Sequence, residues 1–121
     1  MTKILIVDDS ATIRKMVRTS LASLKTDFLD AGTGFEAIEQ LALAPIALIV
    51  LDLNMPDMHG IDVMKFVRNH QSYRDVPIVV LTTRNDEASR KTAADAGATA
   101  YVTKPFTPQF LATTVQTLLH D

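Results

Sequence analysis

The chain has 121 residues, of which 47% are hydrophobic and 21% charged, and its formal net charge is -2 at pH 7. This composition is typical of one globular domain over residues 1–121, and it argues against a disordered chain or a basic nucleic-acid-binding protein. Disulfides and thiolate metal sites are excluded because there is no cysteine. The sequence has neither a signal-peptide pattern nor an apolar run of the roughly 18 residues that a membrane span needs, so we expect residence in the cytoplasm and no membrane partner.

Strand-like and helix-like segments alternate along the chain. A continuous apolar run at 3–7 predicts the first strand, and apolar residues at helical spacing over 11–24 predict the first helix. Helix 86–96 is rich in alanine, and Gly97 is placed to cap its C-terminal end. The other expected strands are 27–31, 47–51, 77–81 and 99–102, and the other expected helices are 35–43, 59–69 and 107–119.

The helical periodicity also predicts which side chains face the core. The inward residues are expected to be Ile13, Met16, Val17, Leu21 and Leu24 on the first helix, Ile38, Leu41 and Ala42 on the second, Met64 and Val67 on the third, and Phe110, Leu111, Thr114, Val115, Leu118 and Leu119 on the last. Arg14, Lys15 and Arg18 lie off the first of these stripes. We interpret these three basic residues as a solvated helix face.

Five repeats of strand and helix predict a doubly wound α/β fold, in which helices cover both faces of a five-stranded parallel sheet. Ligands of such sheets bind beyond the carboxyl ends of the strands. Polar residues occur at the ends of four predicted strands, namely Asp8 with Asp9, Asp52, Thr82 and Lys104. We therefore expect carboxylates, a hydroxyl and an ammonium group to converge on one site.

Asp8, Asp9 and Asp52 are the candidate metal ligands. Carboxylates this close repel one another unless a cation compensates, and Mg²⁺ is commonly held by carboxylates together with a phosphate. Asp52 is also the candidate nucleophile, because an ionised carboxylate needs no general base to attack phosphorus. The simpler alternatives are that Asp8 or Asp9 caps the following helix and that Asp52 forms a turn.

Lys104, Thr82 and Tyr101 are the other candidates. Lys104 could stabilise charge on the oxygens of a transferring phosphoryl group, and a cis bond to Pro105 would turn it toward the strand ends. The Thr82 hydroxyl could donate to a phosphoryl oxygen, with Tyr101 as a two-position switch that reports on it. The alternatives are a solvated lysine in a turn, a helix-capping Thr82 and a half-buried Tyr101 that only packs.

Several short motifs follow one another in a distinctive order. They are Val7-Asp8-Asp9-Ser10, Leu51-Asp52, Asn54-Met55-Pro56, Gly60, Leu81-Thr82, Gly97-Ala98, Tyr101 and Lys104-Pro105-Phe106. Together they resemble the receiver domains of two-component response regulators over essentially the whole chain, and most closely the stand-alone CheY-like chemotaxis regulators. The resemblance implies a flavodoxin-like (βα)5 fold with strand order 2-1-3-4-5 and a single receiver domain without an effector domain.

The resemblance also implies a chemistry. Asp52 would receive a phosphoryl group from the phosphohistidine of a CheA-like sensor histidine kinase. Mg²⁺, or Mn²⁺ in its place, would be held by Asp8, Asp9, Asp52 and the backbone carbonyl of Asn54. The protein would then be a signalling protein and not an enzyme, since it would catalyse only its own phosphoryl transfer and dephosphorylation.

The implied switch begins at Thr82 and Lys104, which would bind the phosphoryl oxygens. Movement of Thr82 and rotation of Tyr101 would reshape the surface made by helix 86–96, strand 99–102 and helix 107–119. The implied partners of this surface are a flagellar motor switch protein or a phosphatase, and the implied oligomeric state is a monomer.

Three residues near the site are expected to control access to it. By the resemblance, Asn54 and Arg84 would occupy the family's two variable positions that govern access of the hydrolytic water. Thr83 replaces the Ala or Gly that is usual there. We expect its extra bulk to narrow the opening to Asp52.

Other classes of protein remain open on the sequence alone. A haloacid-dehalogenase-like phosphatase would place an acid–base aspartate two residues after the nucleophile, where this chain has Asn54. A flavodoxin-like flavin binder would need a hydroxyl- and glycine-rich loop where this chain has Asp8 and Asp9. Within the receiver family, a phosphorelay intermediate and the receiver module of a larger regulator are the alternatives to a chemotaxis regulator.

Overall fold

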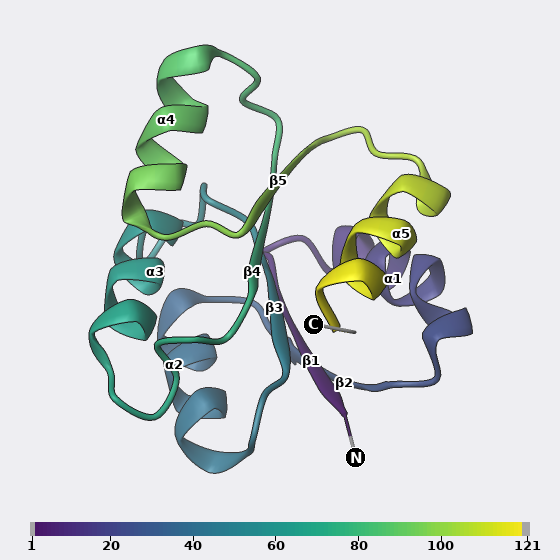
Figure 1. Ribbon diagram of the computed structural model, residues 1–121, viewed down its shortest axis with the longest axis horizontal. Coiled ribbons are helices and arrows are strands. Elements are labelled where there is room, and N and C mark those ends of the chain that lie inside the picture. Colours follow the sequence, from purple (N-terminus) through teal and green to yellow (C-terminus); the bar gives the residue numbers. More distant parts are fainter. Residues whose placement is uncertain (1, 120–121) are drawn as a thin grey trace.

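The computed structural model describes residues 2–119, and it contains one five-stranded parallel sheet in the order β2-β1-β3-β4-β5 (Figure 1). This order and the flanking helices confirm the predicted doubly wound fold. The strands are β1 (Lys3–Val7), β2 (Asp27–Ala31), β3 (Leu48–Leu51), β4 (Ile78–Thr82) and β5 (Ala100–Thr103). The helices are α1 (Ala11–Ser20), α2 (Gly34–Leu43), α3 (Gly60–Asn69), α4 (Glu87–Ala96) and α5 (Pro108–Leu119), with a 3₁₀ turn η1 (Ala22–Leu24) after α1.

Helices cover the sheet on both faces. Figure 1 shows α1 and α5 on one side and α2, α3 and α4 on the other. Successive residues of a strand point to opposite faces, so β1 contributes Ile4 and Ile6 to the core under α1 and α5, and Leu5 and Val7 to the core under α2 and α3. Burial on both faces explains why the central strands are apolar at nearly every position. None of the helices within residues 2–119 has the length and apolar character needed to cross a bilayer.

The first helix is shorter than predicted. It ends at Ser20, the tighter turn η1 follows, and Lys25 adopts a left-handed conformation with φ of 55° that redirects the chain into β2. The apolar periodicity extended to Leu24 because Leu21 and Leu24 still pack against the core. Periodicity reports burial, and burial continues past the end of the α-helix.

Three side chains that were expected to face inward are exposed. Met16 is 46% exposed and Phe110 is 57% exposed, and Ala42 also lies at the surface. On α1 the buried line runs through Val17 and Leu21, and Met16 falls at its margin. The predicted stripes were therefore too wide, because a short helix on a sheet buries only the line of residues that contacts the strands.

Arg68 joins three segments at the edge of the sheet where the strands begin. From α3 its guanidinium donates to the carbonyl oxygens of Gly97 at 2.7 Å, Arg74 at 2.8 Å and Val76 at 2.7 Å. Gly97 caps α4 with φ of 113°, and a Cβ atom there would lie 2.7 Å from Arg68 Cγ. The side chain thus holds the end of α4 and the loop before β4 against α3.

We expect Arg68→Gln to lower the free energy of unfolding by about 2–3 kcal/mol, since hydrogen bonds from a charged donor are worth roughly 1.5–3 kcal/mol. The change is measured by urea denaturation with circular dichroism. Arg74→Gln is the matched control, because the exposed Arg74 takes part only through its backbone carbonyl. Equal losses in the two variants would contradict this role for Arg68.

Candidate functional site

The ends of four strands bring the predicted site residues to one edge of the sheet. Asp8, Asp52 and Lys104 directly follow β1, β3 and β5, and Thr82 is the last residue of β4. Their backbones extend the sheet hydrogen bonding, since Asp8 N donates to Ala31 O at 3.0 Å and Asp52 N donates to Val7 O at 2.9 Å. Lys104 N donates to Thr82 O at 2.7 Å in the same way. The buried sheet therefore fixes the point at which each side chain emerges.

Three carboxylates and one ammonium group form the centre of this edge. Oxygens of Asp8, Asp9 and Asp52 lie within 4.8 Å of one another, with Asp8 and Asp52 buried and Asp9 exposed. Lys104 Nζ donates to Asp8 Oδ2 at 2.8 Å and lies 3.6 Å from Asp52 Oδ1. One lysine offsets only part of the negative charge, and the donor atoms are the carboxylate oxygens that Mg²⁺ prefers. The donor set therefore fits a hard divalent cation.

Burial makes the charged form of Asp52 unfavourable. Desolvation raises the pKa of Asp52, and the neighbouring Asp8 charge raises it further. The Lys104 ammonium and the backbone N–H of Asn54, which lies 3.4 Å from Asp52 Oδ1, lower it in part. The net result is a pKa above the usual value for aspartate. A cation at this edge would relieve the repulsion that remains.

Asp8 is fixed in place, but it does not cap the following helix. Ser10 is the N-cap of α1, since its side chain accepts the N–H of Ile13 at 3.2 Å. The Asp8 carboxylate accepts the N–H of Ser10 at 2.9 Å, and its carbonyl oxygen accepts Arg14 Nη1 at 2.6 Å. The alternative that Asp8 or Asp9 serves as the helix cap is therefore wrong.

Of the three basic residues expected on a solvated helix face, Lys15 and Arg18 are exposed, whereas Arg14 is largely covered. The guanidinium groups of Arg14 and Arg18 pair with Asp30 of β2, with Arg14 Nε 3.4 Å from Asp30 Oδ2. The Arg14 side chain is only 19% exposed. The pairing of Arg14 could have been predicted from its position near the start of a helix that follows the acidic loop, which contains Asp8 and Asp9.

Thr82 and Tyr101 meet through the loop between β4 and α4. The buried Thr82 hydroxyl accepts the N–H of Arg84 at 3.2 Å, which leaves its own proton available to donate. Tyr101 OH donates to the carbonyl of Arg84 at 2.8 Å, and Arg90 lies 4.6 Å from the centre of the Tyr101 ring. Desolvation raises the pKa of Tyr101. Asp86, not Thr82, caps α4.

The simpler alternatives, a solvated turn lysine for Lys104 and a turn-forming role for Asp52, have different outcomes. The Lys104 side chain is 15% exposed and ion-paired, so it is not a solvated turn lysine, and its bond to Pro105 is cis. Asp52 does accept the N–H of Asn54, as a turn-forming aspartate would. That contact uses one oxygen and is compatible with the cluster.

The residues expected to control access lie at the rim. Asn54, Thr83 and Arg84 are all exposed. Asn54 and Arg84 line a cavity of about 280 Å³ between the loop after β3 and the start of α4. Thr83 is not among the residues that line this cavity.

Asp57 is a supporting residue that the sequence reasoning missed. From the loop after β3 it accepts the N–H groups of Gly34 at 3.0 Å and Phe35 at 3.1 Å, and so it anchors this loop to the start of α2. Desolvation raises the pKa of Asp57, but these two hydrogen bonds, together with the backbone N–H groups of Asp57 and Met58, outweigh it, and the net pKa is lowered. Gly60 follows the same loop, and this position requires glycine because a Cβ atom there would lie 2.6 Å from the Asp52 carbonyl oxygen.

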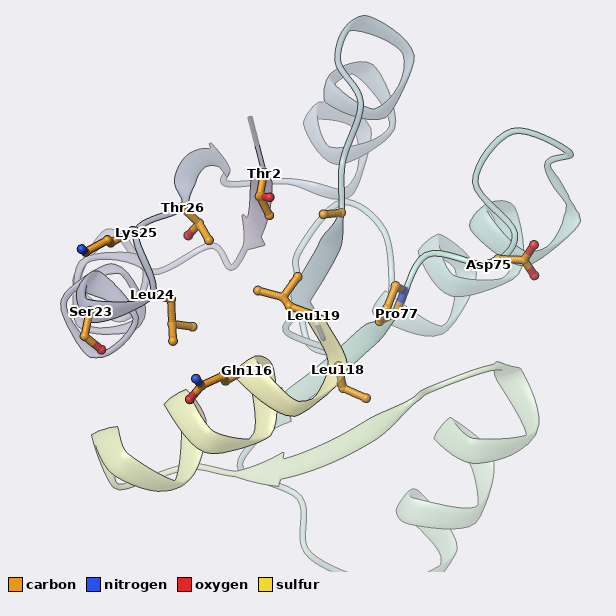
Figure 2. Close-up of a pocket in the computed structure, with 11 residues that line it drawn as sticks. Thr2, Ser23, Leu24, Lys25, Thr26, Asp75, Pro77, Gln116, Leu118 and Leu119 are labelled. Carbon is orange, nitrogen blue, oxygen red and sulfur yellow. The ribbon is translucent and has the colours of Figure 1, made fainter. Parts of the chain in front are cut away.

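A larger hollow lies at the other edge of the sheet. Figure 2 shows this cavity of about 650 Å³, which includes Thr2 and Pro77 next to the first residues of β1 and β4. Lys25, Asp75 and Gln116 supply its polar lining together with Ser23 and Thr26. None of the predicted site residues lines this cavity, so it is separate from the carboxylate cluster.

Comparison with known proteins gives a consistent result. The sequence profile of the response regulator receiver domain matches residues 4–116. The chain is 40% identical over 119 residues to chemotaxis protein CheY1 of Helicobacter pylori, covering 97% of this chain and 96% of that protein. It is 37% identical to a probable transcriptional regulator, ycf27, of Porphyridium aerugineum, where the match covers 97% of this chain and 48% of that protein. The solved structure of chemotaxis response regulator CheY4 of Vibrio cholerae superposes with a TM-score of 0.91 at 36% identity, covering 98% of each chain.

Proposed function

The chain belongs to the response regulator receiver family, and on that premise we propose that it is a phosphorylation-activated switch whose phosphoacceptor is Asp52. The phosphoryl donor is the phosphohistidine of a CheA-like sensor histidine kinase. The observation that carries this proposal is the buried Asp52 carboxylate, which lies among Asp8, Asp9 and Lys104. A carboxylate that is buried, crowded by like charges and faced by one ammonium group is poorly explained by stability alone.

The chemistry is a transfer between two nucleophiles. An oxygen of Asp52 attacks phosphorus as the P–N bond of the phosphohistidine breaks, and the imidazole of the kinase leaves. Asp8, Asp9, Asp52 and the Asn54 carbonyl would hold Mg²⁺, whose positive charge would offset the repulsion between the carboxylates and the phosphoryl oxygens. Mn²⁺ can take the same ligands.

Lys104 and Thr82 bind the transferred group. The Lys104 ammonium lies 3.6 Å from Asp52 Oδ1, so a small movement brings it to an oxygen of a phosphoryl group attached there. The Thr82 hydroxyl has a proton to donate at the end of the neighbouring strand. Charge on the equatorial oxygens is thus met by an ammonium group and a hydroxyl that the sheet already holds in place.

The output surface consists of α4, β5 and α5. Thr82 is connected to Tyr101 through the backbone of Arg84, which accepts from Tyr101 and donates to Thr82. A shift of Thr82 toward a phosphoryl group therefore disturbs the loop that holds the tyrosine. Within α4 only Ala93 is buried, so little apolar contact opposes movement of this helix.

Chemotaxis is the favoured pathway because relatives of nearly equal length are chemotaxis proteins. A flagellar motor switch protein or a phosphatase is then the partner of a monomeric switch, and no nucleic acid is involved. The match to half of a transcriptional regulator keeps a receiver module of a larger protein as a second candidate, along with a phosphorelay intermediate. Asn54 at the acid–base position makes a turnover hydrolase the weakest candidate.

Intact-mass spectrometry after incubation with acetyl phosphate tests the proposal. We expect a mass increase of one phosphoryl group with MgCl₂ and none with excess EDTA. Sustained turnover of small phosphate esters would favour the hydrolase instead. No mass increase at any Mg²⁺ concentration, in a folded sample, would reject phosphorylation of this site by a small phosphodonor.

The bulk of Thr83 is expected to slow access to Asp52. Thr83→Ala should therefore be phosphorylated by acetyl phosphate, or lose its phosphoryl group to water, several-fold faster than the parent protein. Both rates are measured by intact mass over time. Thr113→Ala, which truncates an exposed threonine on α5, is the control. Parent-like values for both rates in Thr83→Ala would rule out this role.

A further inference from the structure

The guanidinium group of Arg14 lies directly against the acidic loop. Its Nη1 donates to the carbonyl oxygen of Asp8 at 2.6 Å, and its Nε lies 3.4 Å from Asp30 Oδ2. Side chains of a helix lean toward its N-terminus, and this brings a residue of α1 back onto the loop that precedes the helix. The Arg14 side chain therefore bridges the acidic loop and β2.

The support behind Arg14 is rigid. Asp30 belongs to β2 and pairs in register with Ile6 of β1. Asp30 is also bound by Arg18, whose guanidinium lies 5.7 Å from the centre of the Phe28 ring. Gly32 leaves room for the bridge, because a Cβ atom there would lie 3.3 Å from Arg14 Nη1.

The carbonyl that Arg14 holds determines the direction of the next residue. Since a peptide group is planar, fixing the Asp8 oxygen fixes the plane that leads to the Asp9 Cα atom. The Asp8 carboxylate is already held by Ser10 N and Lys104. In contrast, no hydrogen bond of the Asp9 carboxylate is found within residues 2–119. The position of the Asp9 carboxylate thus depends on the peptide plane and not on hydrogen bonds of its own.

We propose that Arg14 is a positioning residue of the cation site, which orients Asp9 for the metal by holding the Asp8 carbonyl against the Asp30 support. This inference rests on the proposed function, because it assumes that Asp9 binds Mg²⁺. An electrostatic role and a positioning role of Arg14 predict opposite changes in Mg²⁺ affinity when the side chain is removed. A cation beside three carboxylates repels Mg²⁺, so its loss would tighten binding if charge alone mattered. Loss of a residue that orients a ligand weakens binding, by about 10-fold to 100-fold in known metal sites.

The experiment measures metal affinity without any phosphodonor. Mg²⁺ binding is followed by isothermal titration calorimetry, and Mn²⁺ binding by the electron paramagnetic resonance signal of the free ion. The variants are Arg14→Gln, Arg14→Lys and Asp30→Asn, at a temperature where circular dichroism shows each to be folded. Lys15→Gln is the matched control, since it also removes a cation from α1, and within residues 2–119 its exposed side chain forms no ion pair or hydrogen bond.

Arg14→Gln is expected to bind both metals about 10-fold more weakly than the parent protein. Arg14→Lys should recover part of that loss, Asp30→Asn should bind several-fold more weakly than the parent protein, and Lys15→Gln should match the parent protein. Unchanged or tighter binding by Arg14→Gln would overturn the inference while leaving the proposed function intact. If Arg14→Gln does not fold, Asp30→Asn decides, and parent-like affinity there overturns the inference. Absence of metal binding by the parent protein would reject the proposed cation site itself, and the inference with it.

Discussion

Asp52→Asn is expected to abolish phosphorylation by acetyl phosphate and, at the same time, to make the metal-free protein more stable. The first effect follows because a carboxamide has no anionic oxygen with which to attack phosphorus. The second follows because burial and the Asp8 charge oppose ionisation of Asp52, as its raised pKa reflects. At neutral pH the folded protein holds this charge at a cost, and the neutral, nearly isosteric amide removes it.

The two effects are measured on the same samples. Intact mass should show no phosphoryl adduct on Asp52→Asn after incubation that modifies the parent protein fully. Urea denaturation in EDTA should show a gain in unfolding free energy on the order of 1 kcal/mol. Asp95→Asn is the control, since its side chain is 68% exposed and Lys91 is its one ion-pair partner among residues 2–119. A phosphoryl adduct on Asp52→Asn would mean that another residue is the acceptor, and a loss of stability would mean that the Asp52 charge is well compensated.

The strands and the residues that follow them could be predicted because burial leaves a direct trace in the sequence. Ile4 to Val7 are apolar since both faces of β1 are covered, and Asp8 is conspicuous because it breaks that run. The same contrast identifies Asp52 and Lys104. Parallel strands then bring these residues together without further information.

The supporting contacts could not be predicted in the same way. Asp57 holds Gly34 and Phe35, and Arg68 holds Gly97, across sequence separations that no local pattern records. The end of α1 at Ser20 was missed because Leu21 and Leu24 stay packed against the core and so continue the apolar periodicity. The site residues follow from strand ends, whereas their supports depend on how loops and helices pack.

Lys104→Gln is expected to reduce the rate of phosphorylation by acetyl phosphate about 10²-fold to 10³-fold, which is the usual effect in enzymes of removing one group that stabilises developing charge. It should also lower the unfolding free energy in EDTA by roughly 3 kcal/mol, because two buried carboxylates lose their cation. Both effects arise from one ammonium group, which serves Asp8 and Asp52 in the resting protein and the phosphoryl oxygens during transfer.

The Mg²⁺ affinity of Lys104→Gln shows whether slower phosphorylation reflects loss of the ammonium group or structural damage to the site. With Lys104 absent, the three carboxylates carry more uncompensated charge, so Lys104→Gln should bind Mg²⁺ more tightly than the parent protein even as it reacts more slowly. Lys91→Gln is the matched control, since its ammonium group pairs with Asp95 at the surface, where the Lys91 side chain is 76% exposed. Slower phosphorylation accompanied by weaker Mg²⁺ binding would indicate a collapsed site. Parent-like phosphorylation would show that the ammonium group does not act on the transferring phosphoryl group, and that its pairing with Asp8 and Asp52 is structural only.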